Sequence, residues 1–139
     1  MIVNAQTVKG QPIMSQLTSN FWRHEMRCRC GCGLDTIDWQ TLEVAQQVCD
    51  HFAKRLQIPR VICRVHSAAR CAKHNAAVGG SPTSQHLFGR AMDISIVGVK
   101  PQEIYDYLCA MFPDQYGFGL YKTFAHIDTR STGPARWEV

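Results

Sequence analysis

Apolar residues recur every three to four positions between Trp39 and Leu56, and this pattern predicts a long amphipathic helix over about residues 37–56. Asp35 and Thr36 are its expected cap, and Pro59 its expected end. Two further helices are predicted, a short one over 70–77 and one of about ten residues that begins at Pro101.

Short runs of β-branched or alternating apolar residues lie between these helices. The predicted strands are 61–65, 91–96, 117–121 and 124–128, and the last two are close enough in sequence to form a hairpin. Helices packed on a small, mainly antiparallel sheet make an α+β domain. Residues 1–20 are polar and lack periodicity, so we expect an N-terminal arm followed by a single domain over 21–139.

Composition excludes several classes of protein. The 139-residue chain has a net charge of only +4 and contains no Lys/Arg run interleaved with aromatic residues, so no nucleic-acid groove is expected. No apolar run approaches the length of a membrane span, and the first residues lack the pattern of a secretory signal. We therefore expect a monomer that is cytoplasmic as synthesised and is not inserted in a membrane.

Seven cysteines are many for such a chain. Cys28, Cys30 and Cys32 alternate, which makes disulfides within the group difficult, and their spacing fits poorly with the usual spacing of zinc ligands. A disulfide from this group to Cys71 and a set of reduced thiols both remain open. A catalytic cysteine is disfavoured because no cysteine has an evident histidine partner in the sequence.

The chemistry-bearing pattern lies in the second half of the chain. His86 precedes a glycine turn, Asp93 follows on a predicted strand, and His126 lies on another predicted strand. Two imidazoles and one carboxylate, with a fourth position left for water, are a typical ligand set for a catalytic zinc ion. The sequence therefore predicts one zinc ion held by these three residues.

The same residues carry a resemblance to a known family. The stretch from Ser84 to Ile94 resembles the S-x-H-x-x-G-x-A-x-D-I signature of the M15 zinc peptidases, which share the hedgehog/D-alanyl-D-alanine peptidase fold. The segments 21–33, 66–71, 74–80 and 124–137 resemble, in order, the other motifs of the phage-type branch of that family. The resemblance implies a peptidase that hydrolyses amide bonds in the peptide stems of peptidoglycan, for example as a phage or prophage lysis enzyme.

The resemblance also implies roles for individual residues. Arg70 aligns with an arginine that contacts substrate or the developing oxyanion, and a surface salt bridge is the alternative role. His66, Ser84 and Gln85 are the further candidates for substrate binding.

The general base is where this sequence departs from many relatives. They carry Glu or Asp three residues before the last zinc histidine, but Thr123 stands at that position here. Asp128 is the nearest carboxylate, and it acts either as the base or as a partner that orients His126. Because the usual acid is missing, a non-catalytic, zinc-containing module that binds the cell wall is the alternative function.

Overall fold

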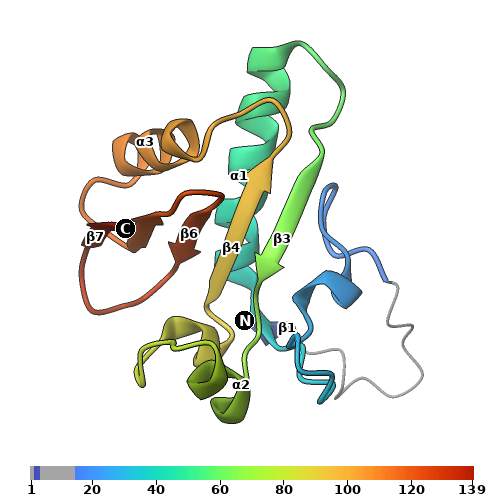
Figure 1. Ribbon diagram of the computed structural model, residues 1–139. Helices are drawn as coiled ribbons and strands as arrows, with labels where there is room; N and C mark the ends of the chain where they lie inside the picture. Colours follow the sequence, from blue (N-terminus) through green and yellow to red (C-terminus); the bar gives the residue numbers. More distant parts are fainter. Residues whose placement is uncertain (1, 4–14) are drawn as a thin grey trace.

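The computed structural model describes residues 2–3 and 15–139, and its main feature is a five-stranded sheet (Figure 1). Neighbouring strands in this sheet are antiparallel except β5 and β7, which are parallel. In spatial order the strands are β3 (Cys63–Ser67), β4 (Ala91–Ile96), β6 (Ala125–Asp128), β5 (Gly117–Leu120) and β7 (Ala135–Glu138). The predicted α+β class with a mainly antiparallel sheet is confirmed.

Helices and short elements fill the connections between the strands. The α-helices of the described residues are α1 (Trp39–Leu56), α2 (Ala72–Ala77) and α3 (Pro101–Met111). Two 3-10 turns, η2 (Arg23–Met26) and η3 (Gln85–Phe88), precede β2 and β4 in the chain. The short strands β1 (Ile2–Val3) and β2 (Ile37–Asp38) pair antiparallel in a separate two-stranded sheet. Most of the predicted N-terminal arm lies outside the described residues.

The start of the long helix was predicted wrongly. Asp38, not Asp35 or Thr36, caps α1, and its side chain accepts a hydrogen bond of 2.8 Å from the backbone N–H of Gln40. The cap moves because residues 37–38 are extended in β2, so helical backbone begins only at Trp39. The predicted end at residue 56 is confirmed.

The remaining elements differ from their predictions by a few residues at most. β4 has the predicted bounds, and β5 and β6 form the predicted hairpin. β3 begins two residues later than predicted, and so does α2, because Cys71 serves as the N-cap of α2. β7 was not predicted, because a short edge strand with one large apolar residue, Trp137, has too little pattern to detect.

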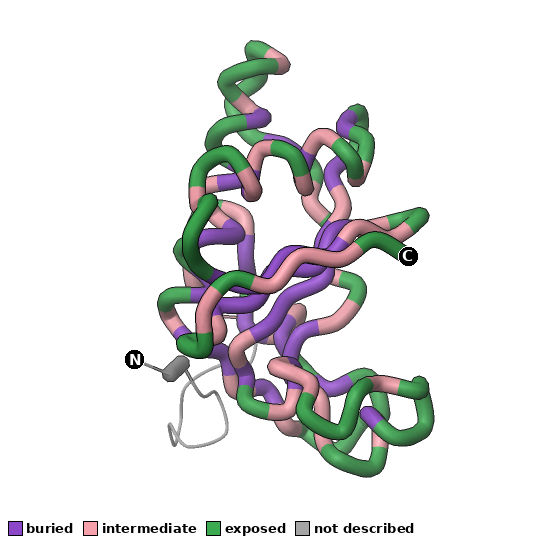
Figure 2. The backbone as a smooth tube through the Cα atoms, turned by 90° about the vertical axis from the view of Figure 1, so that its left-hand side faces the viewer, coloured by how far each residue is buried: buried purple, intermediate pink, exposed green. Residues whose placement is uncertain are grey.

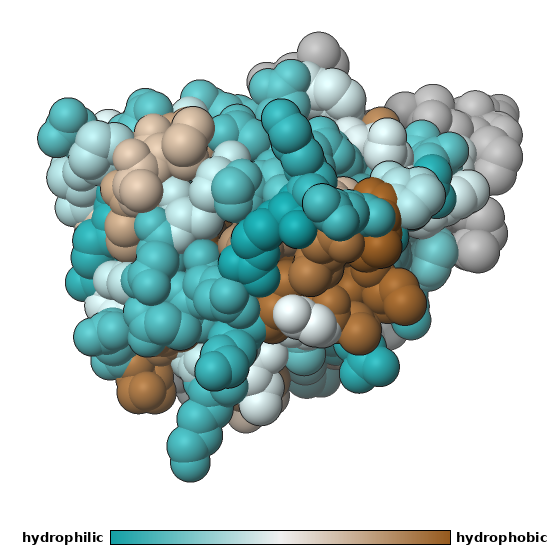
Figure 3. All heavy atoms as spheres, turned by 90° about the horizontal axis from the view of Figure 1, so that it is seen from above, coloured by the Kyte–Doolittle hydropathy of each residue, from teal (hydrophilic) through white to brown (hydrophobic). Residues whose placement is uncertain are grey.

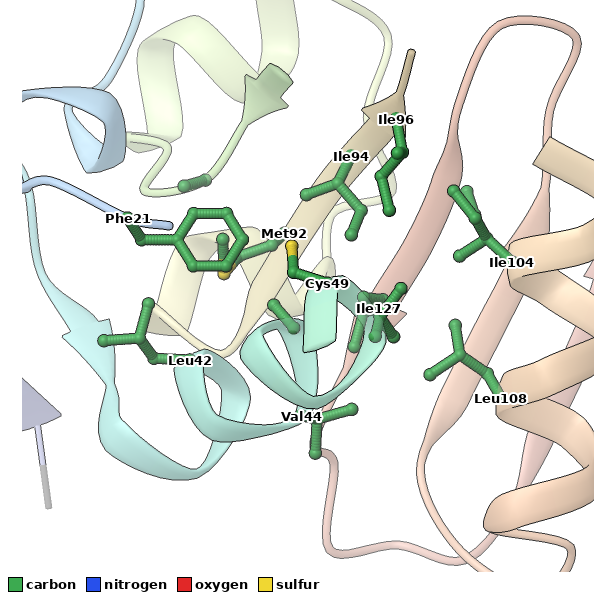
Figure 4. Close-up of a cluster of buried hydrophobic side chains, with 14 of the residues drawn as sticks. Phe21, Leu42, Val44, Cys49, Met92, Ile94, Ile96, Ile104, Leu108 and Ile127 are labelled. Atoms are coloured by element: carbon green, nitrogen blue, oxygen red, sulfur yellow. The ribbon is translucent and has the colours of Figure 1, made fainter. Parts of the chain in front are cut away.

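The hydrophobic core lies between one face of the sheet and the helices α1 and α3. Figure 4 shows side chains of α1 and α3 directed toward those of β4 and β6, with Met92, Ile94 and Ile127 fully buried among them. In Figure 2 the middle strands are buried while the loops around them are exposed. Because successive residues of a strand point to opposite faces, the residues between these apolar ones point to the other face of the sheet.

The surface seen from above is mainly hydrophilic, with one large apolar patch and smaller apolar areas (Figure 3). At this end of the molecule, where α1 and β4 finish, the exposed large apolar side chains are Ile58, Ile62 and Val97. Among the described residues, no helix is both long and apolar enough to cross a membrane.

Candidate active site

The candidate site is a single row of residues that crosses the whole sheet on the face opposite the core. Register places Asp93 of β4 directly opposite Ser67 on one side and opposite His126 of β6 on the other. The row continues from His126 to Gly119 of β5 and to Trp137 of β7. Strand pairing therefore brings together two predicted ligands that lie 33 residues apart in the sequence.

His86 joins this row from the turn that precedes β4. Ser84 begins η3 by accepting a hydrogen bond from the His86 backbone N–H, and Gly89 ends it with a φ of 68°. A side chain at Gly89 would also collide with the Thr36 backbone, so this tight turn needs glycine twice over. The His86 ring is buried, and its Nδ1 lies 2.7 Å from the Ala68 carbonyl oxygen. That acceptor places the proton on Nδ1 and leaves Nε2 as the unprotonated nitrogen.

Asp93 is buried among cations and imidazoles. Its carboxylate oxygens lie 2.8 Å from His126 Nδ1, 3.2 Å from His86 Nε2 and 3.7 Å from Arg70 Nη2. Burial alone would raise the pKa of this carboxyl, but the two imidazoles beside it hold the pKa well below its ordinary range. Asp93 is therefore ionised, as a metal ligand must be.

These three residues fit a metal ion. His86, Asp93 and His126 each offer a ligand atom, and the atoms all lie within 4.8 Å of one another. His86 Nε2 is buried and has no hydrogen-bond partner, since its contact with Asp93 lacks hydrogen-bond geometry. A buried nitrogen lone pair without a donor is costly unless it binds something else, and a metal ion satisfies it. The donor set of two nitrogens and one oxygen suits zinc.

Asp128 lies beside the row, two residues after His126 and on the same face of β6. Its Oδ2 accepts from His126 Nε2 at 2.8 Å, and Arg130 holds the carboxylate with two hydrogen bonds of 2.8 and 2.7 Å. The carboxyl is fully buried, and although burial works against it, Arg130 and His126 lower the pKa of Asp128 below its ordinary value. Between Asp93 and Asp128 the pKa of His126 is in turn raised, against the effect of its own burial.

Arg70 lies at the mouth of this cluster and is not a surface ion pair. Its Nη1 donates to Asn75 Oδ1 and its Nη2 to Ser67 Oγ, each at 3.0 Å, which fixes the guanidinium beside Asp93. Gly80 is required here, because a Cβ at that position would lie 2.1 Å from Asn75 Oδ1 and 2.8 Å from Arg70 Nη1. The glycine of the 74–80 segment thus makes room for the arginine clamp.

The cluster opens into a cleft of about 830 Å³. All the predicted site residues line it, and so do the aromatic side chains of Tyr121, Phe124 and Trp137. His66, one of the predicted substrate-binding residues, has its Nε2 2.7 Å from Ser95 Oγ. Among the described residues that line the cleft, Asp93 and Asp128 are the only carboxylates, whereas Arg29, Arg70 and Arg130 supply positive charge. The cleft is therefore suited to an anionic ligand.

Comparison with protein families supports this geometry. A family model described as Peptidase M15 matches residues 19–128, which is most of the chain. The chain belongs to the M15 peptidase family. The match includes all three candidate metal ligands, and M15 peptidases are metallopeptidases. No curated protein and no solved structure gave a significant match.

Two features of this M15 peptidase were missed by sequence reasoning. Arg130 lies in the segment 124–137 and was given no role, yet it makes the ion pair that holds Asp128. Gly117 and Gly119 were treated only as strand residues. A Cβ at Gly117 would lie 2.5 Å from both oxygens of Asp128, and one at Gly119 would lie 2.4 Å from Trp137 Nε1. The alternation Gly-x-Gly in a predicted strand is the signal that something packs against its backbone.

Proposed function

We propose that this M15 peptidase is a zinc enzyme that hydrolyses amide bonds in the peptide stems of peptidoglycan. The observation that carries the proposal is the buried row of His86, Asp93 and His126, in which His86 Nε2 has no hydrogen-bond partner. The nature of the substrate rests on family membership and on the positive charge of the cleft, because stem peptides carry free carboxylates.

The zinc ligands would be His86 Nε2, an Asp93 oxygen and His126 Nδ1. Bound zinc supplies a Lewis acid that polarises the scissile carbonyl and lowers the pKa of a water molecule toward about 7. The protein fixes the ligands in advance, since the Ala68 carbonyl orients His86 and Asp128 orients His126.

We assign Arg70 the role of binding the substrate. Its guanidinium is held by Ser67 and Asn75, and it faces the cleft beside the carboxylate that binds the metal. A guanidinium in this position can bind a substrate carboxylate or the oxyanion that forms during attack. Ser84 and Gln85 lie on the cleft wall where they can contact the peptide.

Of the two roles open to Asp128, we favour that of a positioning residue. Its oxygens are occupied by His126 and Arg130, and its side chain is fully buried. A general base needs a free oxygen within reach of the attacking water. His66 lines the same cleft, where partial desolvation lowers the pKa of its imidazole, and it is the next candidate to accept the proton.

The test is hydrolysis of defined muropeptides, followed by mass spectrometry of the products. The enzyme loaded with zinc should release new amino termini, lose that activity with a chelator and recover it with added zinc. The mass of the products identifies the bond that is cut. Activity that survives complete removal of metal would refute the proposal.

One observation favours the alternative function. The exposed Thr123 replaces the usual acid, and both carboxylates of the cleft are already engaged. Zinc binding and retention on purified cell wall, without release of amino termini from any muropeptide, would favour a binding module. Membership of the phage-type branch and a role in lysis rest on the motif resemblance, and lysis of permeabilised bacteria by the added enzyme would test that role.

A further inference from the structure

Four cysteines that the proposed reaction does not use come together at one corner of the molecule. Cys28, Cys30 and Cys32 lie in the loop between η2 and β2, and Cys71 lies at the start of α2. Their sulfur atoms all lie within 4.8 Å of one another. Among the described residues this is the second group, after the His-Asp-His site, whose ligand atoms converge in this way.

The local backbone explains how alternating cysteines reach the same side. Gly31 and Gly33 have φ values of 84° and 90°, a conformation that glycine adopts at little cost, so the chain turns sharply between the cysteines. The turn is closed by hydrogen bonds from Gly31 N to Cys28 O and from Cys28 N to Leu34 O. The alternating spacing of the three cysteines is unusual for zinc ligands, but the glycine turn and the addition of Cys71 bring four sulfur atoms together.

Three of the four sulfur atoms have the separation of thiolate ligands around one ion, and the sulfur of Cys32 lies within 4.8 Å of each of them. The distances are 3.5 Å between Cys28 and Cys30, 3.6 Å between Cys30 and Cys71, and 3.8 Å between Cys28 and Cys71. Four sulfurs at a Zn–S distance of about 2.3 Å in a tetrahedron lie about 3.8 Å apart. A disulfide would require about 2.05 Å between two sulfurs. The cysteines of the structure are all free thiols, so the cluster has the geometry of a metal cage.

The surroundings also suit thiolates. The backbone N–H of Cys71 lies 3.4 Å from Cys28 Sγ, and that of His74 lies 3.4 Å from Cys71 Sγ. Such N–H groups stabilise charge on sulfur and orient the ligands. Arg27 and Arg29 alternate with the cysteines, and their positive charge offsets the net negative charge of four thiolates on a divalent ion.

We propose that Cys28, Cys30, Cys32 and Cys71 bind a second metal ion, a structural zinc in a tetrathiolate site. The ion ties the loop before β2 to the start of α2. Because Cys71 follows Arg70 directly, and Arg29 of the same loop lines the cleft, the ion also braces one wall of the candidate active site. This inference does not depend on the proposed reaction.

The first test is the metal content of the full chain, purified under reducing conditions with zinc present. Wild type should contain two zinc ions per chain. His86→Ala should contain one, and the double variant Cys30→Ser/Cys32→Ser should also contain one. Cys109→Ser is the matched control, because Cys109 is partly buried outside the cluster, and it should retain two.

A second measurement keeps the proposal testable if the double variant does not fold. Wild type loaded with cobalt should show the intense absorption of a tetrahedral thiolate site, and His86→Ala should show it as well. In both proteins the four clustered thiols should resist alkylation until the metal is removed. A single zinc per wild-type chain that His86→Ala loses and Cys30→Ser/Cys32→Ser keeps, no thiolate absorption, or a disulfide among the four cysteines detected by mass spectrometry would overturn the second site. None of these results would affect the His86 site.

Discussion

Asp128 provides the sharpest test of how this site works, because its two roles predict different results for one substitution. Asp128→Asn is nearly isosteric, so the packing of a fully buried side chain is preserved while its charge is lost. The amide keeps one oxygen for Arg130 or His126 but cannot serve both as the carboxylate does. The direct effect should therefore fall on the orientation and basicity of His126.

The size of that effect follows from the contacts. Loss of a hydrogen-bonding partner of a metal ligand typically weakens metal binding about 10- to 100-fold, or about 1.4–2.7 kcal/mol. If Asp128 only positions His126, excess zinc should restore most of kcat. If it is the general base, kcat should stay about 10²- to 10⁴-fold low however much zinc is added.

The assay is a zinc titration followed by muropeptide hydrolysis at saturating zinc. Arg130→Gln is the matched control, since it removes the ion pair but leaves the Asp128 carboxylate in place, and it should show a smaller loss of zinc affinity. A variant that binds zinc as wild type does and yet loses kcat would refute the positioning role. In that case Asp128 would be the general base, and His66 would no longer be needed as a candidate for that role.

Three further sets of substitutions test the metal ligands, Arg70 and the Gly119–Trp137 contact. The ligand variants are His86→Ala, Asp93→Ala and His126→Ala. Each should abolish zinc binding at the active site, because three protein ligands leave no redundancy. Competition with a chelating dye measures this loss. Arg70→Lys keeps the positive charge but loses the two parallel N–H donors of the guanidinium, so kcat/KM should fall about 10- to 100-fold with zinc content unchanged. Wild-type kinetics in this variant would exclude a contact between Arg70 and the substrate. Gly119→Ala should displace Trp137, which its Cβ would approach to 2.4 Å, and should alter tryptophan fluorescence and raise KM while zinc stays bound. Trp137→Phe is its control, and an unchanged KM in both variants would remove Trp137 from the substrate cleft.

Periodicity was sufficient to predict most of the fold. The helices α1 and α3 and the strands β4 to β6 follow from apolar spacing, because the apolar residues of each form one continuous face that packs in the core. β7 and the true cap of α1 could not be predicted, since both depend on pairing with segments that are distant in sequence.

In the candidate site, too, some features could be predicted from the sequence and others depend on contacts between distant segments. Spacing and the strand pattern predicted His86, Asp93 and His126 as one group, and the structure brings them together. The register that sets Asp93 opposite His126 is fixed only by tertiary packing. For the same reason the sequence could not show that Asp128 is held by Arg130, or that Cys71 completes the cysteine cluster.

The row that crosses the sheet has a consequence for local stability. Asp93 and His126 lie on strands with a hydrogen-bonded neighbour on each side, whereas Ser67 and Trp137 lie on the two edge strands. Edge strands open at lower free energy than central ones, so amide hydrogens should exchange faster in β3 and β7 than in β4 and β6. The two proposed metal ligands on the central strands, Asp93 and His126, would then stay fixed while the two ends of the row fluctuate. The cleft would thereby admit the proposed substrate without loosening a bound ion.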